Sequence, residues 1–281
     1  MRLSPRSTIS PGLARSWLLV AASTTTALAE AVASDADAVV IDLEDGVAEH
    51  RKEHARRLTR EWLDTSPPVW IRVNDVSTPH WRADLDALAG APNLAGVMLA
   101  KTEHPDQVEE TAARLGGTPV VALIESALGL EEARPIARCT ATVRLAFGSG
   151  DYRKDTGAAD TALALAYPRS RLVVASRAER IPPPIDGPTH SATDDGLRSG
   201  TADGAATGMT GKLCLHTAHT GIVNAALSPT DAELRWAEEV IERLGADGTN
   251  VQYGSERPVL ERALRIRTRR QSFASVDRRA R

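Results

Sequence analysis

Short apolar runs rich in valine and isoleucine alternate along this chain with longer, alanine-rich and charged segments of helical period. The apolar runs span residues 16–22, 37–45, 69–74, 95–101, 118–126, 141–148, a weaker 183–187, and 211–217. The segments between them span residues 25–33, 48–63, 80–89, 106–115, 128–137 and 159–180. Continuous apolar strands separated by helices indicate a parallel sheet covered on both faces. Eight such units in roughly 225 residues predict an α/β fold, the (β/α)₈ or TIM barrel.

A doubly wound open sheet is the competing architecture. No GxGxxG or GxxxxGK[ST] motif follows a strand, which removes the usual nucleotide-binding versions of that fold. The predicted parts are an N-terminal extension (1–14), the barrel (15–230), a C-terminal helical segment (231–264) that packs on the barrel or on a neighbouring subunit, and a basic tail (265–281). The tail is expected to be solvated and prone to disorder. The glycine- and threonine-rich stretch 188–210 predicts a frayed helix or a mobile loop.

Composition excludes several classes of partner. The 281 residues carry a formal net charge of only -3, so no nucleic-acid partner is expected. The longest apolar runs, such as WLLVAA at 17–22, are far short of the ~20 residues of a membrane helix, so no membrane association is expected. Cys139 and Cys214 are isolated and have no CxxC spacing, which indicates a reducing, cytoplasmic compartment and no structural zinc.

Charged side chains recur at the carboxyl ends of the predicted strands. Because residues two apart on a strand share a face, Asp42 points the same way as Glu44, and Trp70 the same way as Arg72. All strand ends of a barrel meet at one mouth, where the chemistry of this fold takes place. The residues expected at the mouth are Asp42, Glu44, Arg72, Lys101, Glu125, Asp151 and His216. For any one of them, a capping role or an ion pair at the rim is an equally good interpretation.

A half-buried group of carboxylates is self-repelling unless cations compensate it. Arg72 and Lys101 supply part of that compensation, and a divalent cation held by two or three of the acids would supply the rest. Oxygen ligands without cysteine or an HxxxH pair favour Mg²⁺, with Mn²⁺ as the second choice, over zinc. Magnesium takes only one or two protein carboxylates and leaves its other positions to water and substrate.

Motifs distributed over most of residues 15–262 carry a resemblance to a known family. They are RSWLLV at 15–20, VVIDLEDGV at 39–47, IRVN at 71–74, VMLAKTE at 97–103, ALIESALGL at 122–130, LAFGSGDYRKDTG at 145–157, IDGPT at 185–189 and GKLCLHTAHTGIVNAALSPTDAELRWAEEV at 211–240. In this order they resemble the HpcH/HpaI aldolase/citrate lyase family, in the citrate lyase β-subunit-like branch that includes malyl-CoA and citramalyl-CoA lyases.

The resemblance implies a Mg²⁺-dependent barrel, usually a homotrimer, that makes or breaks a carbon–carbon bond next to a thioester. Glu125 and Asp151 match the family's metal ligands. Arg72 matches its substrate-binding arginine, and Asp42 and Glu44 match paired acids that lie around the metal and its waters.

Further positions are expected to contact substrate or a neighbouring chain. Lys101 and the turn Gly148-Ser149-Gly150 are the additional substrate contacts. Glu256, within SERP at 255–258, takes the place of a C-terminal aspartate that the family sends into a neighbouring subunit's site.

Two segments at the mouth depart from the family's pattern. A Pro-Gly-Asp/Asn-Arg-Pro turn usually helps to seat coenzyme A, and here it reads AASTTTAL at 21–28, without the glycine and the arginine. Coenzyme A would have to bind through Ser23, Thr24 and the threonines that follow, or the acyl carrier is a different one. HTAH at 216–219 replaces His-Pro-Ser/Ala-Gln, and we expect His216 and His219 to be structural or substrate contacts, not metal ligands.

The predicted function is a Mg²⁺-dependent carbon–carbon lyase that cleaves or forms a β-hydroxyacyl thioester such as malyl-, citramalyl- or citryl-CoA. A 2-keto acid would chelate the metal, Arg72 would stabilise an enolate oxygen, and Asp42 or Glu256 would move the proton. A Schiff base on Lys101 is the less favoured route. The alternatives are a thioesterase, in which water attacks the acyl group, an aldolase acting on a carrier-bound or free acid, and a non-catalytic subunit of a lyase complex.

Overall fold

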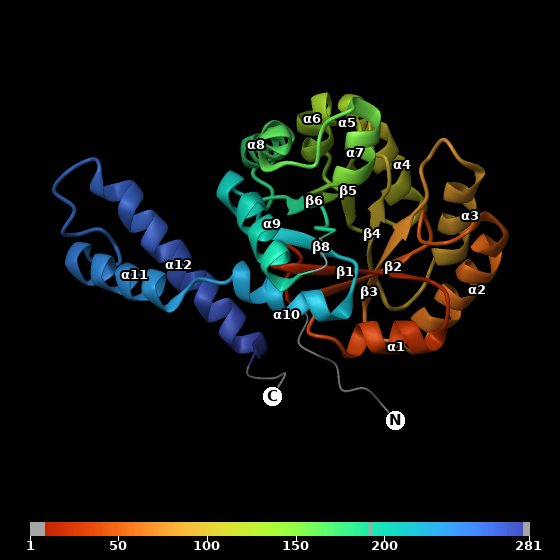
Figure 1. Cartoon of the computed structure of the whole chain (residues 1–281), viewed down its shortest axis with the longest axis horizontal. Helices are drawn as coiled ribbons and strands as arrows, with labels where there is room; N and C mark the ends of the chain where they lie inside the picture. The colour runs from red at the N-terminus through yellow and green to blue at the C-terminus, as the bar shows by residue number, and fades with distance from the viewer. Residues whose placement is uncertain (1–8, 191–192, 278–281) are drawn as a thin grey trace. The chain divides into compact units, whose positions relative to one another are not determined.

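Parallel strands form the centre of the molecule's first compact unit, Ile9–Leu227. A computed structural model describes residues 9–190 and 193–277 of the chain. Within it, the strands pair in chain order from β1 to β8 and close into a barrel (Figure 1). They are β1 (Ser16–Ala21), β2 (Ala38–Asp42), β3 (Val69–Val73), β4 (Leu94–Leu99), β5 (Val120–Ile124), β6 (Thr142–Phe147), β7 (Ile185–Asp186) and β8 (Gly211–Cys214). The predicted (β/α)₈ barrel is thus confirmed.

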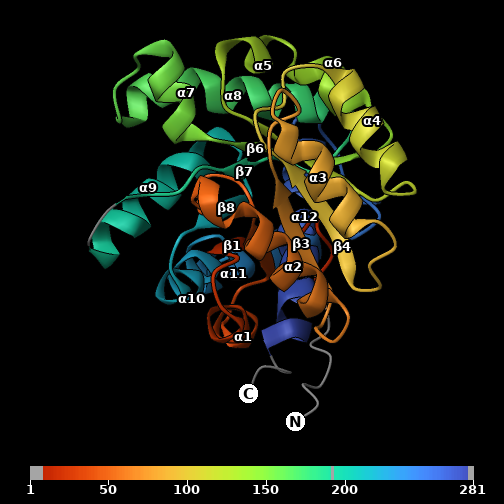
Figure 2. The ribbon, with the colours of Figure 1, turned by 90° about the vertical axis from the view of Figure 1, so that its right-hand side faces the viewer.

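Helices surround the strands, as the view from the side shows (Figure 2). They are α1 (Thr25–Ala33), the 3₁₀ turn η1 (Glu49–Arg51), α2 (Lys52–Leu63), α3 (Pro79–Leu88), α4 (Pro105–Arg114), α5 (Ala127–Glu131), α6 (Ala133–Arg138), α7 (Ser149–Thr156), α8 (Ala162–Ala178), α9 (Asp194–Thr207) and α10 (Thr217–Ala226). Among the described helices, none is both long and apolar enough to cross a bilayer.

The two faces of the strands build two different apolar cores. Side chains such as Val40, Met98 and Leu123 fill the barrel interior, while their strand neighbours pack outward against the helices. Inside the barrel, the rings of Trp17 and Trp70 lie 5.2 Å apart in an edge-to-face arrangement. This double burial explains why the strands are continuous apolar runs. It also leaves the mouth as the place where inward-facing charged side chains reach solvent.

The glycine- and threonine-rich stretch forms an ordered helix. Helix α9 has 14 residues, begins at the cap Thr193, whose hydroxyl accepts a hydrogen bond from the Gly196 amide, and ends at Gly208 with φ 104°. A Cβ on Gly204 would lie 2.6 Å from the Asp186 carboxylate of β7. The expectation of a mobile loop is therefore wrong for this part, because the small residues allow the helix to pack closely on the barrel. Residues 191 and 192 lie outside the described residues.

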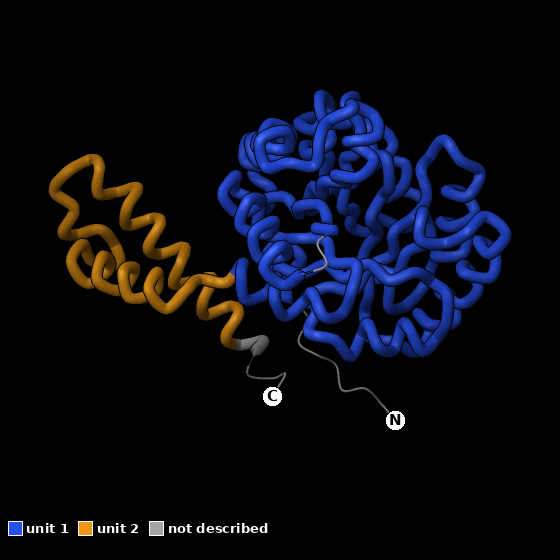
Figure 3. The backbone as a smooth tube through the Cα atoms, viewed as in Figure 1, with its two compact units in different colours: residues 1–5, 9–227 blue, residues 6–8, 228–281 orange. Residues whose placement is uncertain are grey.

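A second compact unit begins at Ser228 and contains α11 (Asp231–Leu244) and α12 (Glu256–Asp277) (Figure 3). Its apolar core consists of Ala237, Val240, Ile241, Leu244, Leu260 and Ala263. Helix α12 includes residues 265–277 of the predicted basic tail. Its arginines are used in contacts: Arg262 stacks on the Trp236 ring and Arg270 pairs with Asp231. Residues 278–281, and residues 1–8 of the expected N-terminal extension, lie outside the described residues.

Candidate active site

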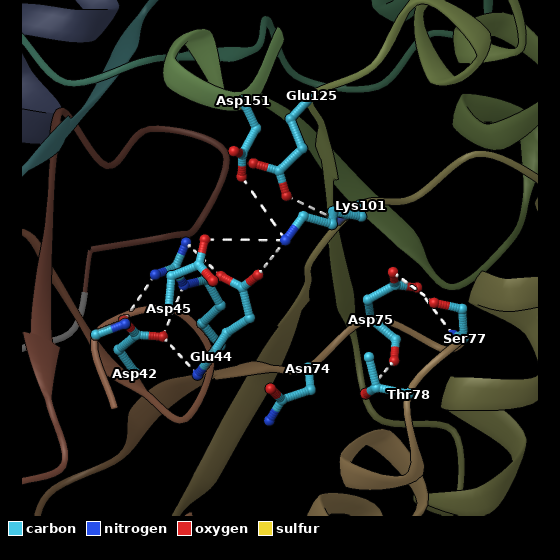
Figure 4. Close-up of polar contacts among 12 residues, drawn as sticks. Asp42, Glu44, Asp45, Asn74, Asp75, Ser77, Thr78, Lys101, Glu125 and Asp151 are labelled. Carbon is cyan, nitrogen blue, oxygen red and sulfur yellow. Dashed lines mark hydrogen bonds and ion pairs between the residues drawn. The ribbon is translucent and has the colours of Figure 1, made fainter. Parts of the chain in front are cut away.

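Charged side chains from successive strands meet at the carboxyl ends of β2 to β6 (Figure 4). They are Asp42 in β2, Glu44 in the loop that follows it, Arg72 in β3, Lys101 after β4, Glu125 after β5 and Asp151 in the first turn of α7. We term these six residues the mouth cluster. Ion pairs and hydrogen bonds connect every member to at least one other, so the convergence expected from strand geometry occurs for these six residues. His216, also expected at the mouth, contacts the ring of His219.

Asp42 and Arg72 form a two-pronged ion pair across the β2–β3 register, in which they are direct partners. Arg72 Nε donates to Oδ1 at 2.7 Å and Nη2 donates to Oδ2 at 2.6 Å. The Asp42 oxygens also accept hydrogen bonds from the Glu44 and Gly46 amides, at 2.9 and 2.8 Å. Burial lowers the pKa of Arg72, but the carboxylates of Asp42, Glu44 and Glu125 together raise it more, so the guanidinium stays charged. Asp42 thereby fixes the direction in which Arg72 faces the mouth.

Glu44 is buried between two cations. Its Oε1 accepts a hydrogen bond from Lys101 Nζ at 2.8 Å, and its Oε2 lies 3.0 Å from Arg72 Nη1. The Arg72 contact is an ion pair without hydrogen-bond alignment, and Oε2 has no hydrogen-bond partner within the described part of the chain. Burial lowers the pKa of Lys101, but Glu44 and the other nearby acids raise it more, so its ammonium is also charged.

Glu125, directly after β5, is a third buried acid of the mouth cluster. Its Oε1 accepts the Lys101 backbone N–H at 2.8 Å, and its carboxylate occupies the space that a Cβ on Gly148 would need. Burial, and next the negative charge of Glu44, raise the pKa of Glu125 to about 8. Asp151 is less buried, and its Oδ2 lies 3.7 Å from Lys101 Nζ. The carboxylates thus need more positive charge than the protein supplies.

The mouth cluster fits a magnesium ion by the chemistry of its donors. Its candidate ligands are all carboxylate oxygens; one buried oxygen of Glu44 accepts no hydrogen bond within the described residues, and burial and neighbouring acids raise the pKa of Glu125. No three His, Cys, Asp or Glu side chains within residues 9–190 and 193–277 gather as a complete metal cage. Magnesium does not require such a cage, since one or two carboxylates suffice. Glu125 and Asp151 are the two residues that would hold it.

The other predicted site residues occupy different surroundings. Ser149 is buried, and its hydroxyl fills the space beside Gly187, whereas Gly150 is exposed. Ser23 and Thr24 are exposed at the carboxyl end of β1, on the rim of the same mouth. Thr24 caps α1, because its Oγ1 accepts a hydrogen bond from the Ala27 amide at 3.2 Å.

The histidines and Glu256 make contacts of their own. The rings of His216 and His219 lie 5.0 Å apart, edge to face, at the start of α10. Glu256 begins α12 in the second unit, where its Oε2 accepts the Gln252 and Tyr253 amides and Oε1 pairs with Arg243. These two backbone N–H groups lower the pKa of Glu256, which keeps it anionic. Its approach to a neighbouring subunit stays a prediction.

Three residues that lie next to the mouth cluster are not among the site residues predicted from the sequence. Asp45 Oδ2 lies 3.8 Å from Lys101 Nζ and adds to the negative charge around that ammonium. Lys52 and Asn74 are buried and bind the backbone of the loop after β2. The acidic run that contains Asp45 gave a signal for it in the sequence. Nothing in the sequence indicated that Lys52, at the start of a helix, would turn inward.

The geometry defines a (β/α)₈ barrel whose mouth presents an acidic site suited to a divalent cation, flanked by an arginine and a lysine. The family model for HpcH/HpaI aldolase/citrate lyase matches residues 15–217, and that for the HpcH/HpaI aldolase C-terminal domain matches residues 232–274. The chain therefore belongs to the HpcH/HpaI aldolase/citrate lyase family.

Individual relatives agree with this assignment. The chain is 33% identical over 276 residues to a (3S)-malyl-CoA thioesterase of Cereibacter sphaeroides, with 94% of each chain covered. It is 29% identical to the mitochondrial citramalyl-CoA lyase of Rattus norvegicus, with 83% of this chain and 78% of the relative covered. Among solved structures, CitE from Mycobacterium tuberculosis in complex with magnesium, acetoacetate and coenzyme A matches with a TM-score of 0.78 and 30% identity, over 92% of this chain and 99% of that one.

Proposed function

We propose that this protein is a Mg²⁺-dependent carbon–carbon lyase that acts on a β-hydroxyacyl thioester of the malyl-CoA or citramalyl-CoA type, in either direction. The observation that carries the proposal is the mouth cluster, which places two candidate metal carboxylates beside an oriented arginine and a lysine. In support, a similar structure is described with magnesium, a keto acid and coenzyme A.

Cleavage of such a thioester separates a 2-keto acid from the enolate of the remaining acyl group. When bound, Mg²⁺ would act as a Lewis acid toward the carbonyl and carboxylate oxygens of the keto acid. The enolate oxygen needs a fixed positive group, and Arg72, held by Asp42, meets that requirement without reorganising. Lys101 adds a second positive charge on the same side of the mouth.

A proton must leave the substrate hydroxyl, and another must reach the enolate carbon. Both oxygens of Asp42 already accept hydrogen bonds from Arg72 and from backbone amides, which favours an orienting role for this residue. Glu256 from a neighbouring subunit is the other candidate for proton transfer because of its place in the family's pattern, although its own oxygens accept the Gln252 and Tyr253 amides and pair with Arg243.

A thioesterase is the second candidate, because one relative that is similar over 94% of the chain carries that name. In that reaction water would attack the thioester carbonyl, and the hydroxy acid and free coenzyme A would be released intact. The tetrahedral oxyanion would need the same oriented cation that an enolate needs. The mouth cluster therefore does not distinguish the two activities by itself.

Product analysis distinguishes them. The purified protein would be incubated with malyl-CoA and with citramalyl-CoA, with Mg²⁺ or with EDTA, and the products identified by mass spectrometry. We expect glyoxylate or pyruvate together with acetyl-CoA, only when Mg²⁺ is present. Malate or citramalate with free coenzyme A would establish the thioesterase instead. Free 4-hydroxy-2-keto acids in the same screen would reveal an aldolase that does not need the thioester.

A further inference from the structure

Lys52 is a buried ammonium directly behind the loop that carries Glu44. Its side chain is 8% exposed, and Nζ donates to the carbonyls of Leu43 and Glu44, both at 2.8 Å, and to Asn74 Oδ1 at 2.7 Å. An ammonium has three N–H donors, so all of them are used. Among the described residues no carboxylate pairs with it, unlike Lys212, which pairs with Asp186.

A buried charge without a counter-ion is costly, and apolar residues of similar volume often stabilise a core as well or better. Two of the three acceptors of Lys52 are backbone carbonyls, which cannot be replaced by substitution. The ammonium therefore holds the course of the main chain at 43–44 more firmly than an apolar side chain would. This is the point where the chain leaves β2 and enters the mouth.

Asn74 extends the same network to the neighbouring strand. Its Nδ2 donates to the Leu43 carbonyl at 2.9 Å and to Asp84 Oδ2 at 2.6 Å, and its backbone N–H donates to the same Asp84 oxygen at 3.0 Å. Asn74 lies two residues after Arg72 on the same segment of chain. Lys52 and Asn74 together thus connect two segments: the loop that carries Glu44 and the end of the strand that carries Arg72.

We propose that Lys52, acting with Asn74, is a positioning residue that fixes the Glu44 carboxylate against Arg72 and Lys101. The inference rests on the proposed function only in taking Glu44 and Arg72 as parts of the active site. Lys52 touches neither substrate nor reacting atoms in this assignment. It acts on the position of the Glu44 side chain by holding the Leu43 and Glu44 carbonyls.

The test uses Lys52→Met, which keeps the length of the side chain but removes the ammonium. Amide hydrogen exchange would be followed at Glu44 and Gly46, whose N–H groups bond to Asp42. We expect these two amides to exchange at least about 10-fold faster, while the barrel strands keep their protection. If the lyase activity is present, kcat should fall by about 10²-fold, the scale of a misplaced active-site group, with a smaller change in KM.

The matched control is Arg15→Met. Arg15 is equally buried and charged, but it pairs with Asp37 at the amino-terminal end of the barrel, away from the mouth. It should lower the melting temperature without selectively changing exchange at Glu44 and Gly46. Loop exchange in Lys52→Met that rises no more than in this control would overturn the proposal, since the lysine would then be only structural.

Asn74→Ala is the second variant, for the case in which Lys52→Met does not fold. It removes one acceptor of the ammonium and one donor to Leu43, so we expect the same selective loop exchange at a smaller magnitude. Unchanged exchange in Asn74→Ala would contradict the inference. Absence of lyase activity in the unmodified protein would refute the proposed function alone, because the exchange measurement does not depend on turnover.

Discussion

Lys101 contacts two other members of the mouth cluster: its backbone N–H donates to Glu125, and its ammonium donates to Glu44. Its backbone has φ 49°, a conformation that a lysine rarely adopts. Such strain persists only where the surroundings determine it, and here both ends of the residue are held by buried acids. At the scale of single residues, the site consists of carboxylates paired with the two cations Arg72 and Lys101.

The metal assignment predicts the behaviour of two isosteric variants. Glu125→Gln and Asp151→Asn should each abolish Mg²⁺-dependent activity, because a neutral amide removes an anionic ligand from the ion. Without metal, Glu125→Gln should not lower the melting temperature, since the raised pKa shows that burial and Glu44 already oppose the charged form. Activity after EDTA treatment and return of Mg²⁺ is the measurement. Normal turnover by either variant would exclude that residue as a ligand.

Arg72→Lys keeps the charge at the mouth and removes the planar fork. Two guanidinium nitrogens bind Asp42 while Nη1 faces Glu44, a set of contacts that one ammonium cannot reproduce. We expect kcat/KM to fall by about 10²-fold or more, the scale of removing one oxyanion donor. Steady-state kinetics with the thioester substrate would measure the change. A variant within a factor of about three of the parent would argue against the role, because that factor is well under 1 kcal/mol.

At the scale of elements, helix starts and strand ends carry the chemistry, and glycines set how closely they approach. Gly148 lies between β6 and α7, and its lack of a side chain leaves the space that the Glu125 carboxylate occupies. Gly204 does the same for α9 against Asp186. Any side chain at Gly148 or Gly204 would force the neighbouring acid, Glu125 or Asp186, to move.

The segment at 21–28 predicts weak binding of coenzyme A esters. It offers hydroxyls and amides to a phosphate, and these contacts are weaker than a guanidinium fork. The triple variant Ala21→Pro, Ala22→Gly, Thr24→Arg should therefore bind acetyl-CoA more tightly in calorimetry, with Mg²⁺ and a keto acid present. Thr24→Ala alone is the control, because it removes the α1 cap, at a cost of about 1 kcal/mol, without adding an arginine. Tight binding by the unmodified protein that the triple variant leaves unchanged would show that this loop is not the anchor.

At the scale of the whole molecule, the second unit raises the question of assembly. We predict a homotrimer in which Glu256 of one subunit completes the site of the next. Co-expression of Glu256→Gln with Arg72→Lys should then restore part of the activity that each variant lacks alone, because some sites would combine two intact contributions. Light scattering would give the mass of the assembly.

The control for this complementation is the pair Glu125→Gln and Arg72→Lys. Both residues lie in the mouth cluster of one chain, so mixing these variants should restore nothing. If Glu256→Gln behaves like this control, the glutamate serves its own subunit or has no catalytic role. A monomeric mass would contradict the shared site directly.

Much of this protein could be predicted from local patterns. Alternating apolar runs and amphipathic helices determine a barrel, because a parallel strand must be covered on both faces. Acids at strand ends predict a common mouth, because strand ends converge in a closed barrel. The contacts of Asp42, Arg72, Glu44 and Lys101 follow that expectation.

Tertiary structure alone decided the rest, and the reason is packing. Helix α9 forms despite its glycines because Leu197 and Gly204 are buried against neighbouring elements, and burial outweighs intrinsic propensity. Helix α12 extends through basic residues because Ile266 packs against the apolar core of the second unit and Phe273 is buried. Lys52 turns inward because the carbonyl oxygens of Leu43 and Glu44 and the side-chain oxygen of Asn74, on separate segments of the chain, converge on one point. Such convergence depends on how elements meet in space, which no local pattern encodes.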